Sequence, residues 1–310
     1  MGVAKKNGRG LLPRNYSQES GMRPYCVSFR PEVEMEENLP PLAALEDPQT
    51  IDLLRKAAGV LLPSHVSPWR YQGITVHARD WFPRLDVQFH CRGKTRQVHL
   101  FDRMGVRRPE TLVFQTPAEL RDYLSRCGSP WGYPFVLKGD LGGGGDTVFP
   151  VYQAEETAGY LEKLPRDAPL LIQKWVGHGG KDLRVVIYGD QAVSYFRVGG
   201  GRFYNNVCRG GKVDHEGWPE LQRKGVEAAL AFSRNAAIDI AGFDLMFPDD
   251  GAPVFIEVNF HFGRKGLGGR SAHEKYVSMA IERWRDRLLT GRDGVLPAGD
   301  VSGALRGENG

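Results

Sequence analysis

Apolar residues follow two different spacings along the chain, and the alternation between them defines the expected elements. Helical spacing marks the segments 51–58, 95–104, 116–128, 154–164, 218–238 and 273–289. Strand-like runs separate them at 59–62, 134–139, 147–153, 169–176, 182–199, 241–247 and 253–260, and strand character also extends over 74–89. The 182–199 run is expected to be a hairpin that turns at Gly189 and Asp190. Because hairpins and helices alternate without a strict strand–helix–strand repeat, the pattern predicts an α+β fold.

Polar, glycine-rich segments without periodicity lie outside this pattern, at residues 1–22 and 290–310, and we expect both to be mobile tails. The composition, 41% hydrophobic and 25% charged, is ordinary for a soluble globular protein. A net charge of +4, from 41 basic and 37 acidic residues, is too balanced to indicate nucleic-acid binding. No stretch reaches membrane-spanning length, and the four widely spaced cysteines predict reduced thiols in a cytoplasmic protein.

The segment VLKGDLGGGGDTVFPV, residues 136–151, places four consecutive glycines after a lysine and between two strand-like runs. A tight hairpin needs only two loop residues, and each glycine costs backbone entropy on folding. One interpretation is a flexible surface hairpin. The other is a flap whose backbone amides cover a phosphate chain while Lys138 supplies positive charge. The order of residues differs from the P-loop, in which the lysine follows the glycines.

Three oxygen-bearing side chains mark the last strand pair of the pattern. Glu257 and Asn259 are two residues apart, so they point to the same face of a strand, and Asp244 lies in the preceding strand. Mg²⁺ in proteins is commonly held by one or two carboxylates together with phosphates and water. A Glu-x-Asn pattern alone is also typical of a half-exposed strand, but with Asp244 and the Lys138 loop it indicates a metal site.

A series of motifs in this order resembles the ATP-grasp superfamily, most closely the carboxylate–amine ligases of the RimK-like and glutathione-synthetase-like type. The motifs lie between Lys94 and Trp284 and are GKTRQVHLFDRMGVRRPET, PFVLKGDLGGGGDTVFPV, LLIQKWV, KDLRVVIYGDQAVSYFRVG, FYNNVCRGG, AGFDL and FIEVNF. The resemblance implies two α+β subdomains that grip ATP, with residues 94–289 forming the ATP-grasp domain. Residues 23–93 then form a reduced version of the N-terminal α/β domain.

The resemblance also implies roles for individual residues. Lys94, Lys138 and the flap glycines Gly143, Gly144 and Gly145 would bind the phosphates of ATP. Gln173, Lys174, Trp175 and Val176 would form the hinge that holds the adenine, and Asn206 would lie beside the triphosphate. Asp182 would lie near the ribose or the mouth of the site, although a turn aspartate is an equal interpretation.

Arg184 and Arg197 would stabilise the transferring phosphoryl group or bind the substrate carboxylate. Asp244, Glu257 and Asn259 would bind Mg²⁺, with Mn²⁺ as an alternative.

Three segments depart from the family pattern. His261, Phe262, Arg264 and Lys265 replace small residues after the Glu-x-Asn motif, and they suggest an acidic or aromatic substrate or a packing role. Tyr204 and Asn205 stand where relatives often have an arginine and a small residue. The short N-terminal region offers six aromatic and basic residues, for which an interdomain packing surface is favoured over an acceptor site: Trp69, Arg70, Tyr71, Arg79, Trp81 and Arg84.

The activity that the resemblance implies is ATP-dependent amide or peptide bond formation through an acyl-phosphate, with release of ADP and phosphate. The substrates would be a carboxylate and an amine, either small molecules or peptides, without nucleic acid or membrane as partners. An oligomer is compatible with the sequence. Two alternatives stay open: a regulatory ATP-binding module without catalysis, and an ATP-dependent phosphotransferase that stops at a phosphorylated product. Neither the two substrates nor a general base is identified.

Overall fold

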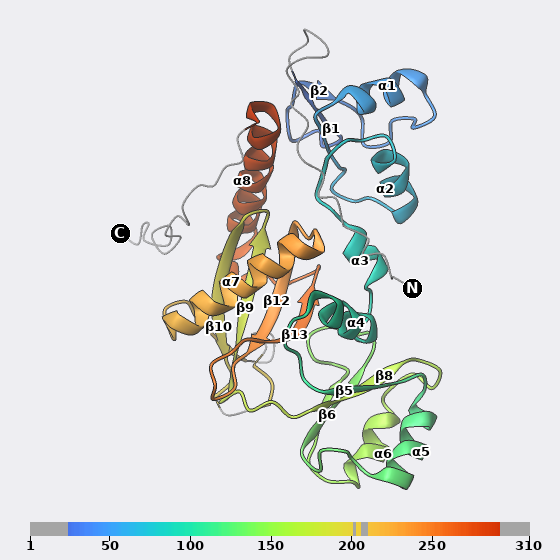
Figure 1. The fold of residues 1–310 in the computed structure, drawn as a ribbon, viewed down its shortest axis with the longest axis vertical. Coiled ribbons are helices and arrows are strands. Elements are labelled where there is room, and N and C mark those ends of the chain that lie inside the picture. The colour runs from blue at the N-terminus through green and yellow to red at the C-terminus, as the bar shows by residue number, and fades with distance from the viewer. Residues whose placement is uncertain (1–23, 201–202, 206–209, 292–310) are drawn as a thin grey trace, which may run out of the picture. The chain divides into compact units, whose positions relative to one another are not determined.

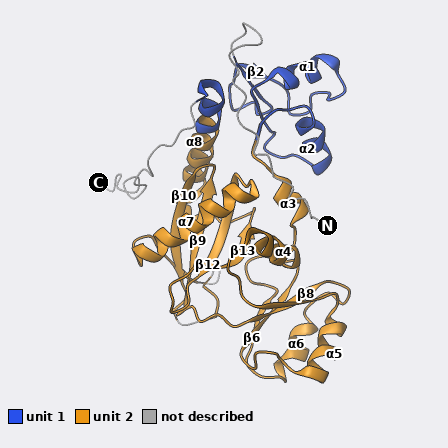
Figure 2. Ribbon diagram, viewed as in Figure 1, with its two compact units in different colours: residues 1–81, 283–298 blue, residues 82–282, 299–310 orange. Residues whose placement is uncertain are grey.

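The computed structural model of the protein describes residues 24–200, 203–205 and 210–291 (Figure 1). The chain divides into two compact units, one of residues 1–81 and 283–298, the other of residues 82–282 and 299–310 (Figure 2). The tails expected at 1–22 and 290–310 lie outside the described residues, apart from Thr290, which ends helix α8 (Gly269–Thr290), and Gly291. Within the described residues, no helix is both long and apolar enough to cross a membrane.

A small sheet in the order β2-β1-β3-β4 organises the first unit, with β1 paired in parallel with both β2 and β3. The strands are β1 (Cys26–Ser28), β2 (Glu37–Asn38), β3 (Gly59–Leu61) and β4 (Trp81–Phe82), and the helices are α1 (Pro48–Lys56) and α2 (Pro68–Thr75). Helix α1 begins earlier than its apolar pattern indicates, because Asp47 accepts a hydrogen bond from the Thr50 backbone N–H and Pro48 occupies the first helical turn.

The expectation of strand character over 74–89 is wrong for most of that segment. Its first residues end α2, which starts at a Ser67 cap followed by Pro68, so helix-starting chemistry overrides the β-branched residues there. Only Trp81 and Phe82 form a strand, and Pro83 then removes a backbone donor that a longer strand would need. The remaining part forms the short helix α3 (Asp86–His90).

The second unit contains two antiparallel sheets. The first has the order β5-β8-β6-β7 and is built from β5 (Thr111–Phe114), β6 (Phe135–Gly139), β7 (Val148–Val151) and β8 (Leu170–Lys174). Helices α5 (Pro117–Cys127) and α6 (Glu156–Leu161) cover one face, where Leu120, Leu137 and Ile172 form the core (Figure 1). The expected hairpin around the glycines is confirmed, because Lys138 at the end of β6 pairs with Val148 at the start of β7.

The other sheet has the order β11-β10-β9-β12-β13, with strands β9 (Lys181–Tyr188), β10 (Gln191–Val198), β11 (Lys212–Asp214), β12 (Ile240–Met246) and β13 (Val254–Asn259). Helix α7 (Pro219–Ala236) packs on one face of it, where Leu183, Phe232 and Phe243 are buried. Helix α4 (Lys94–Met104) lies beside β13. The strands are amphipathic, so residues that alternate with this core point to the opposite face. The expected α+β fold is thus confirmed.

Two glycines in helices of this unit test how closely the core is packed. A Cβ on Gly225 of α7 would lie 2.3 Å from the Leu183 side chain and 3.2 Å from the Leu245 side chain, whereas one on Gly159 of α6 would meet no heavy atom within 4 Å. We expect Gly225→Val to destabilise the protein by about 1–3 kcal/mol through overpacking. Gly159→Ala should stabilise it by about 0.5–1 kcal/mol through helix propensity. Urea unfolding of both variants checks this, and equal effects would contradict the packing described.

Candidate active site

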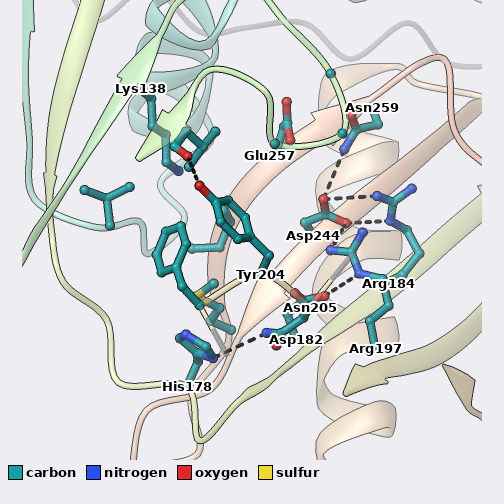
Figure 3. Close-up of a pocket in the computed structure, with 18 of the residues that line it drawn as sticks. Lys138, His178, Asp182, Arg184, Arg197, Tyr204, Asn205, Asp244, Glu257 and Asn259 are labelled. Carbon is teal, nitrogen blue, oxygen red and sulfur yellow. Dashed lines mark hydrogen bonds and ion pairs between the residues drawn. The ribbon is translucent and has the colours of Figure 1, made fainter. Parts of the chain in front are cut away.

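A cavity of about 300 Å³ lies between the two sheets of the second unit (Figure 3). Six basic and three acidic side chains line it, which leaves a surplus of three positive charges. The lining includes every residue to which the family resemblance gave a role in nucleotide, phosphoryl or metal binding, except Asn206, which lies outside the described residues: Lys94, Lys138, Gly143, Gly144, Gly145, Gln173, Lys174, Trp175, Val176, Asp182, Arg184, Arg197, Asp244, Glu257 and Asn259. The fold therefore brings together residues from a helix, several strands and two loops around one cationic cavity.

Lys138 is the most unusual of these residues. All five residues of β6 are buried, and strand alternation turns Val136 and Lys138 toward the cavity while Phe135 and Leu137 face the core. The ammonium group has no hydrogen-bond or ion-pair partner among the described residues, and the residue is only 8% exposed. Burial lowers the pKa of Lys138 from 10.5 to about 8, although Glu257 opposes this shift. A buried cation without a partner is costly unless an anionic ligand binds beside it.

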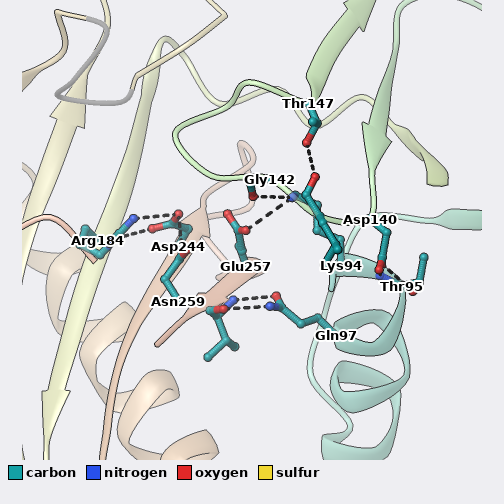
Figure 4. A network of polar contacts seen from close by, with 12 residues as sticks. Lys94, Thr95, Gln97, Asp140, Gly142, Thr147, Arg184, Asp244, Glu257 and Asn259 are labelled. Atoms are coloured by element: carbon teal, nitrogen blue, oxygen red, sulfur yellow. Dashed lines mark hydrogen bonds and ion pairs between the residues drawn. The ribbon is translucent and has the colours of Figure 1, made fainter. Parts of the chain in front are cut away.

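The N-terminus of α4 also borders the cavity, through Lys94 (Figure 4). Lys94 is the first residue of this helix, and its Nζ lies 3.2 Å from the Gly142 carbonyl oxygen and 3.9 Å from Glu257 Oε1. Asp140 secures the helix start: its Oδ1 accepts hydrogen bonds from the Thr95 backbone N–H (2.7 Å) and hydroxyl (2.6 Å), and its carbonyl accepts one from the Lys94 N–H. The N-cap residue of α4 is Gly93, which has no side chain to accept a hydrogen bond from the first turn. The side chain of Asp140 takes over this capping role.

The flap that follows Asp140 has the backbone geometry for which its glycines are suited. Gly142, Gly144 and Gly145 all adopt positive φ angles, of 124°, 63° and 85°. Residues with a Cβ rarely adopt such angles, so glycine is required there on conformational grounds. The Thr147 hydroxyl donates a hydrogen bond to the Leu141 carbonyl across the base of the flap (2.8 Å), which closes the loop.

A row of charged residues crosses four strands of the larger sheet, and all of them except the half-buried Glu257 are buried. The register places Arg197 opposite Asp182, Asp244 opposite Arg184, and Glu257 opposite Asp244. Arg184 contacts both Asp244 oxygens: its Nε lies 2.5 Å from Oδ1 and its Nη2 lies 3.1 Å from Oδ2. Arg197 contacts two carboxylates, with its Nε 2.5 Å from Asp182 Oδ1 and its Nη2 3.1 Å from Asp244 Oδ1. Burial alone would raise the pKa of Asp244, but the two arginines outweigh it and hold that pKa below its usual range.

Apolar side chains also line the cavity. They are Val136, Val148, Met246 and Ile256, and residues 173–176, the expected hinge, line it as well. Within the hinge, the Gln173 side chain donates to the Thr111 hydroxyl (3.0 Å), and the Trp175 ring packs against Phe203 at 5.4 Å. A cavity that combines apolar side chains, polar hinge residues and a surplus of positive charge has the chemistry that a nucleoside triphosphate needs.

The comparison with protein families agrees with this geometry. Residues 91–279, more than half of the chain, match the family model of the RimK-like ATP-grasp domain. The chain belongs to this family. The resemblance inferred from the seven motifs is thereby confirmed.

Individual relatives of this RimK-like protein are distant. It is 29% identical over 206 residues to the ribosomal protein bS6–L-glutamate ligase of Escherichia fergusonii, a match that spans 64% of this chain and 65% of that protein. It is 31% identical over 162 residues to human N-acetylaspartylglutamate synthase A, spanning 51% of this chain and 40% of that protein. The structure of D-alanine–D-alanine ligase from Bacillus anthracis in complex with ATP aligns with this chain at a TM-score of 0.52 and 19% identity. The alignment covers 82% of this chain and 86% of that one, and it supports the fold.

The family implies a divalent metal ion, and the three candidate ligands fit one. Asp244, Glu257 and Asn259 project from adjacent positions on one face of the β12–β13 pair. Asn259 Nδ2 donates to Asp244 Oδ2 (3.2 Å), which leaves the amide oxygen of Asn259 available. Glu257 lies 3.9 Å from Lys94 Nζ and also interacts electrostatically with Lys138. Asp244 is the least available, because both of its oxygens contact guanidinium groups. The described residues contain no cluster of three His, Cys, Asp or Glu side chains, so a hard cation would need phosphate or water ligands as well.

The segments that depart from the family pattern also meet the cavity. His261, Phe262 and Lys265 line it, whereas Arg264 does not. The Phe262 ring makes edge-on contacts with the rings of Tyr188 and His273, at 6.4 Å and 5.8 Å between ring centroids. Packing is therefore at least part of its role. Tyr204 and Asn205 line the cavity too, and the Tyr204 hydroxyl donates to the Val148 carbonyl (2.6 Å).

The cavity contains none of the six aromatic and basic residues considered for an acceptor site in the N-terminal region. Tyr71 and Trp81 instead contact each other, with a hydrogen bond of 2.8 Å between Trp81 Nε1 and the Tyr71 hydroxyl oxygen. The acceptor and packing interpretations of that region stay predictions.

Sequence reasoning missed several residues that shape the site. Tyr195 lines the cavity and alternates with Arg197 on β10, so the two-residue period of the strand could have revealed it. Asp140 and Gln97 act through contacts with residues 45 and 161 positions away, and no local pattern signals such contacts.

Lys138→Met is expected to separate ligand binding from stability. Because the buried ammonium has no partner, its removal should raise the stability of the free protein at pH 7 by about 3 kcal/mol and weaken MgATP binding at least tenfold. The folded pKa of about 8 lies below the usual 10.5, so the unfolded chain binds more protons in this interval. The stability of the unmodified protein relative to the Met variant should therefore rise from pH 8 to 10.5. Thermal unfolding and calorimetric titration test this, and a less stable Met variant at pH 7 would contradict it.

Asp140→Ala is expected to weaken nucleotide binding through the start of α4. Loss of the cap should cost about 1 kcal/mol of stability and loosen the backbone that carries Lys94. Asp140→Asn is the matched control, because its amide oxygen can still accept from Thr95. We expect calorimetry to show several-fold weaker MgATP binding for the Ala variant and near-normal binding for Asn. Equal binding by both variants would show that the cap does not position Lys94.

Proposed function

We propose that this protein is an ATP-dependent carboxylate–amine ligase that joins its substrates through an acyl-phosphate and releases ADP and phosphate. The observation that carries the proposal is Lys138: its side chain is buried on β6, has no hydrogen bond or ion pair with the described residues, and faces a cavity with a surplus of positive charge. Membership of the RimK-like ATP-grasp family supports the same conclusion. Because the match spans 65% of the bacterial relative and 40% of the human one, activity and substrates are proposed here for this chain on its own residues.

The residues suggest a division of the nucleotide along the cavity. The hinge at residues 173–176 would hold the adenine against apolar side chains of the cavity, and Asp182 would lie toward the ribose. Lys94, Lys138 and the amides of Gly143, Gly144 and Gly145 would bind the phosphates, which point charges and backbone donors suit. Mg²⁺ or Mn²⁺, when bound, would neutralise phosphate charge, and Glu257, Asn259 and Asp244 would hold it.

The chemistry requires two displacements. An oxygen of the substrate carboxylate attacks the γ-phosphorus of ATP and ADP leaves, which gives an acyl-phosphate. The amine nitrogen then attacks the acyl carbon, phosphate leaves, and the nitrogen loses a proton. This chain's contribution is positioning and exclusion of water, since the flap between Asp140 and Thr147 borders the cavity and an acyl-phosphate would otherwise hydrolyse.

We further propose that one substrate is an amino acid or peptide with an additional carboxylate. Arg184 and Arg197 each retain N–H donors beyond those that contact Asp182 and Asp244, and Lys265 adds a charge at the same cavity. The names of both curated relatives above include glutamate or a glutamate derivative. A cytoplasmic location, expected from the scattered cysteines, agrees with the three described cysteines being free thiols and stays a prediction.

The proposal is tested by ADP release from MgATP with single amino acids, dipeptides and polyamines, alone and in pairs. Release should need both a carboxylate and an amine, be faster with glutamate than with glutamine, and fall at least a hundredfold in Glu257→Gln. Glu227→Gln is the matched control, because it makes the same change at an exposed ion pair on α7. Its activity should equal that of the unmodified protein.

Other outcomes identify the alternatives. ADP release with a carboxylate alone and a stable phosphorylated product would indicate a phosphotransferase. Tight MgATP binding without turnover for any pair would favour a regulatory module. Failure to bind ATP would refute the proposal altogether.

A further inference from the structure

The strand that carries two of the proposed metal ligands is the last strand of its sheet. In the order β11-β10-β9-β12-β13, strand β13 pairs with β12 and with no other strand of the described residues. Backbone N–H and C=O groups alternate in direction along an antiparallel strand. Glu257, Val258 and Asn259 are all in register with β12, but the backbone N–H and C=O of Val258 bond to a side chain on the other side of β13, so they point to the free edge of the sheet. Val258 is 2% exposed, so these groups need partners within the protein.

Gln97 of α4 supplies both partners (Figure 4). Its Nε2 donates to the Val258 carbonyl at 2.9 Å, and its Oε1 accepts from the Val258 N–H at 2.9 Å. The carboxamide therefore pairs with this residue as the backbone of a neighbouring strand would. Gln97 is itself only 8% exposed, and Val98, Leu100 and Phe101 of the same helix are buried around it. Both partners of these two hydrogen bonds, Gln97 and Val258, are therefore fixed by the packing around them.

The same helix start also holds Lys94 and the base of the flap. Three hydrogen bonds join Lys94 and Thr95 to Asp140, and Gln97 lies one helical turn further on. The side chain of Lys94 reaches toward Glu257 Oε1, 3.9 Å away, from the same helix that grips Val258. A single short stretch of α4 therefore sets the distance between a phosphate-binding candidate and the strand with the metal-ligand candidates.

We propose that Gln97 is a positioning residue for the metal site: its two hydrogen bonds to Val258 fix the placement of Glu257 and Asn259 relative to Lys94. The proposal rests on the proposed function insofar as a divalent cation binds there with the nucleotide. Gln97 touches neither nucleotide nor metal in this scheme and acts through the backbone. Residues that orient metal ligands from outside the ligand set typically change metal affinity by 10–100-fold when they are removed.

Two variants separate this role from general stability. Gln97→Leu keeps a similar size and removes both hydrogen bonds. Gln97→Glu keeps the acceptor for the Val258 N–H but places a carboxylate oxygen against the Val258 carbonyl. The control is Gln222→Leu, another buried glutamine of the same unit, whose side chain donates to the His215 and Gly217 carbonyls and accepts from Ser194, away from the metal candidates.

The measurement is Mn²⁺ binding, followed by electron paramagnetic resonance of free Mn²⁺ with a non-hydrolysable ATP analogue. Binding of the same analogue in EDTA is followed by calorimetry. We expect Gln97→Leu to weaken Mn²⁺ binding about tenfold or more, with metal-free nucleotide affinity within about twofold of the unmodified protein. Gln97→Glu should weaken Mn²⁺ binding less than Gln97→Leu does. Gln222→Leu should lower the unfolding temperature without changing Mn²⁺ affinity.

The inference is overturned if folded Gln97→Leu binds Mn²⁺ as tightly as the unmodified protein, or if Gln222→Leu loses Mn²⁺ affinity to the same degree. If Gln97→Leu does not fold, Gln97→Glu decides, and unchanged Mn²⁺ affinity in that variant overturns the inference. An unmodified protein that binds neither the analogue nor Mn²⁺ instead refutes the proposed function, and this inference with it. The two failures are therefore distinguishable.

Discussion

The buried ammonium of Lys138 is the constraint around which the cavity is organised. It lies on a fully buried strand between two others, so it cannot move to solvent without disrupting the β6 pairings with β7 and β8. The strand holds it in place through the apolar contacts of Phe135 and Leu137 on the opposite face. The core of the smaller sheet thus stabilises a charge that the free protein leaves without a partner, which is a stability cost typical of a binding site.

The larger sheet treats its charges differently. Arg184, Asp244, Arg197 and Asp182 alternate in sign across neighbouring strands and satisfy one another. Buried ion pairs of this kind add little net stability, because desolvation offsets the attraction, but they fix the side chains in one geometry. The cavity is therefore bounded by one sheet with an unpaired cation and one with a rigid, nearly neutral network.

Local spacing was enough for the α+β class, the glycine loop and the Glu257–Asn259 pair, whereas most other candidate residues came from the family resemblance and their roles stay predictions. Period-two alternation placed Glu257 beside Asn259, and the glycines after Lys138 marked a loop with unusual backbone angles. The error over 74–89 has a local cause as well, since β-branched residues there lie in a helix that Ser67 and Pro68 start.

The rest of the site depends on strand order and on contacts between distant residues. That Asp244 faces Arg184 follows only when β12 is known to lie beside β9, and no motif records this neighbour. The pairing of Gln97 with Val258 joins residues 161 positions apart, and an isolated glutamine in an amphipathic helix has no distinctive pattern. Such residues become visible only when the open edge of β13 is examined for backbone groups that need partners.

The contrast between paired and unpaired cations bears on how ligands would be selected. Lys138 can bind an anion without giving up any contact, whereas Arg184 and Arg197 offer only the donors that Asp182 and Asp244 leave unused. A cation bound at Asp244 would draw carboxylate charge away from both arginines and so strengthen their attraction for a substrate carboxylate. If the proposed metal ion and the proposed acidic substrate both bind in this cavity, they should therefore bind cooperatively, because they share Asp244 as a common neighbour.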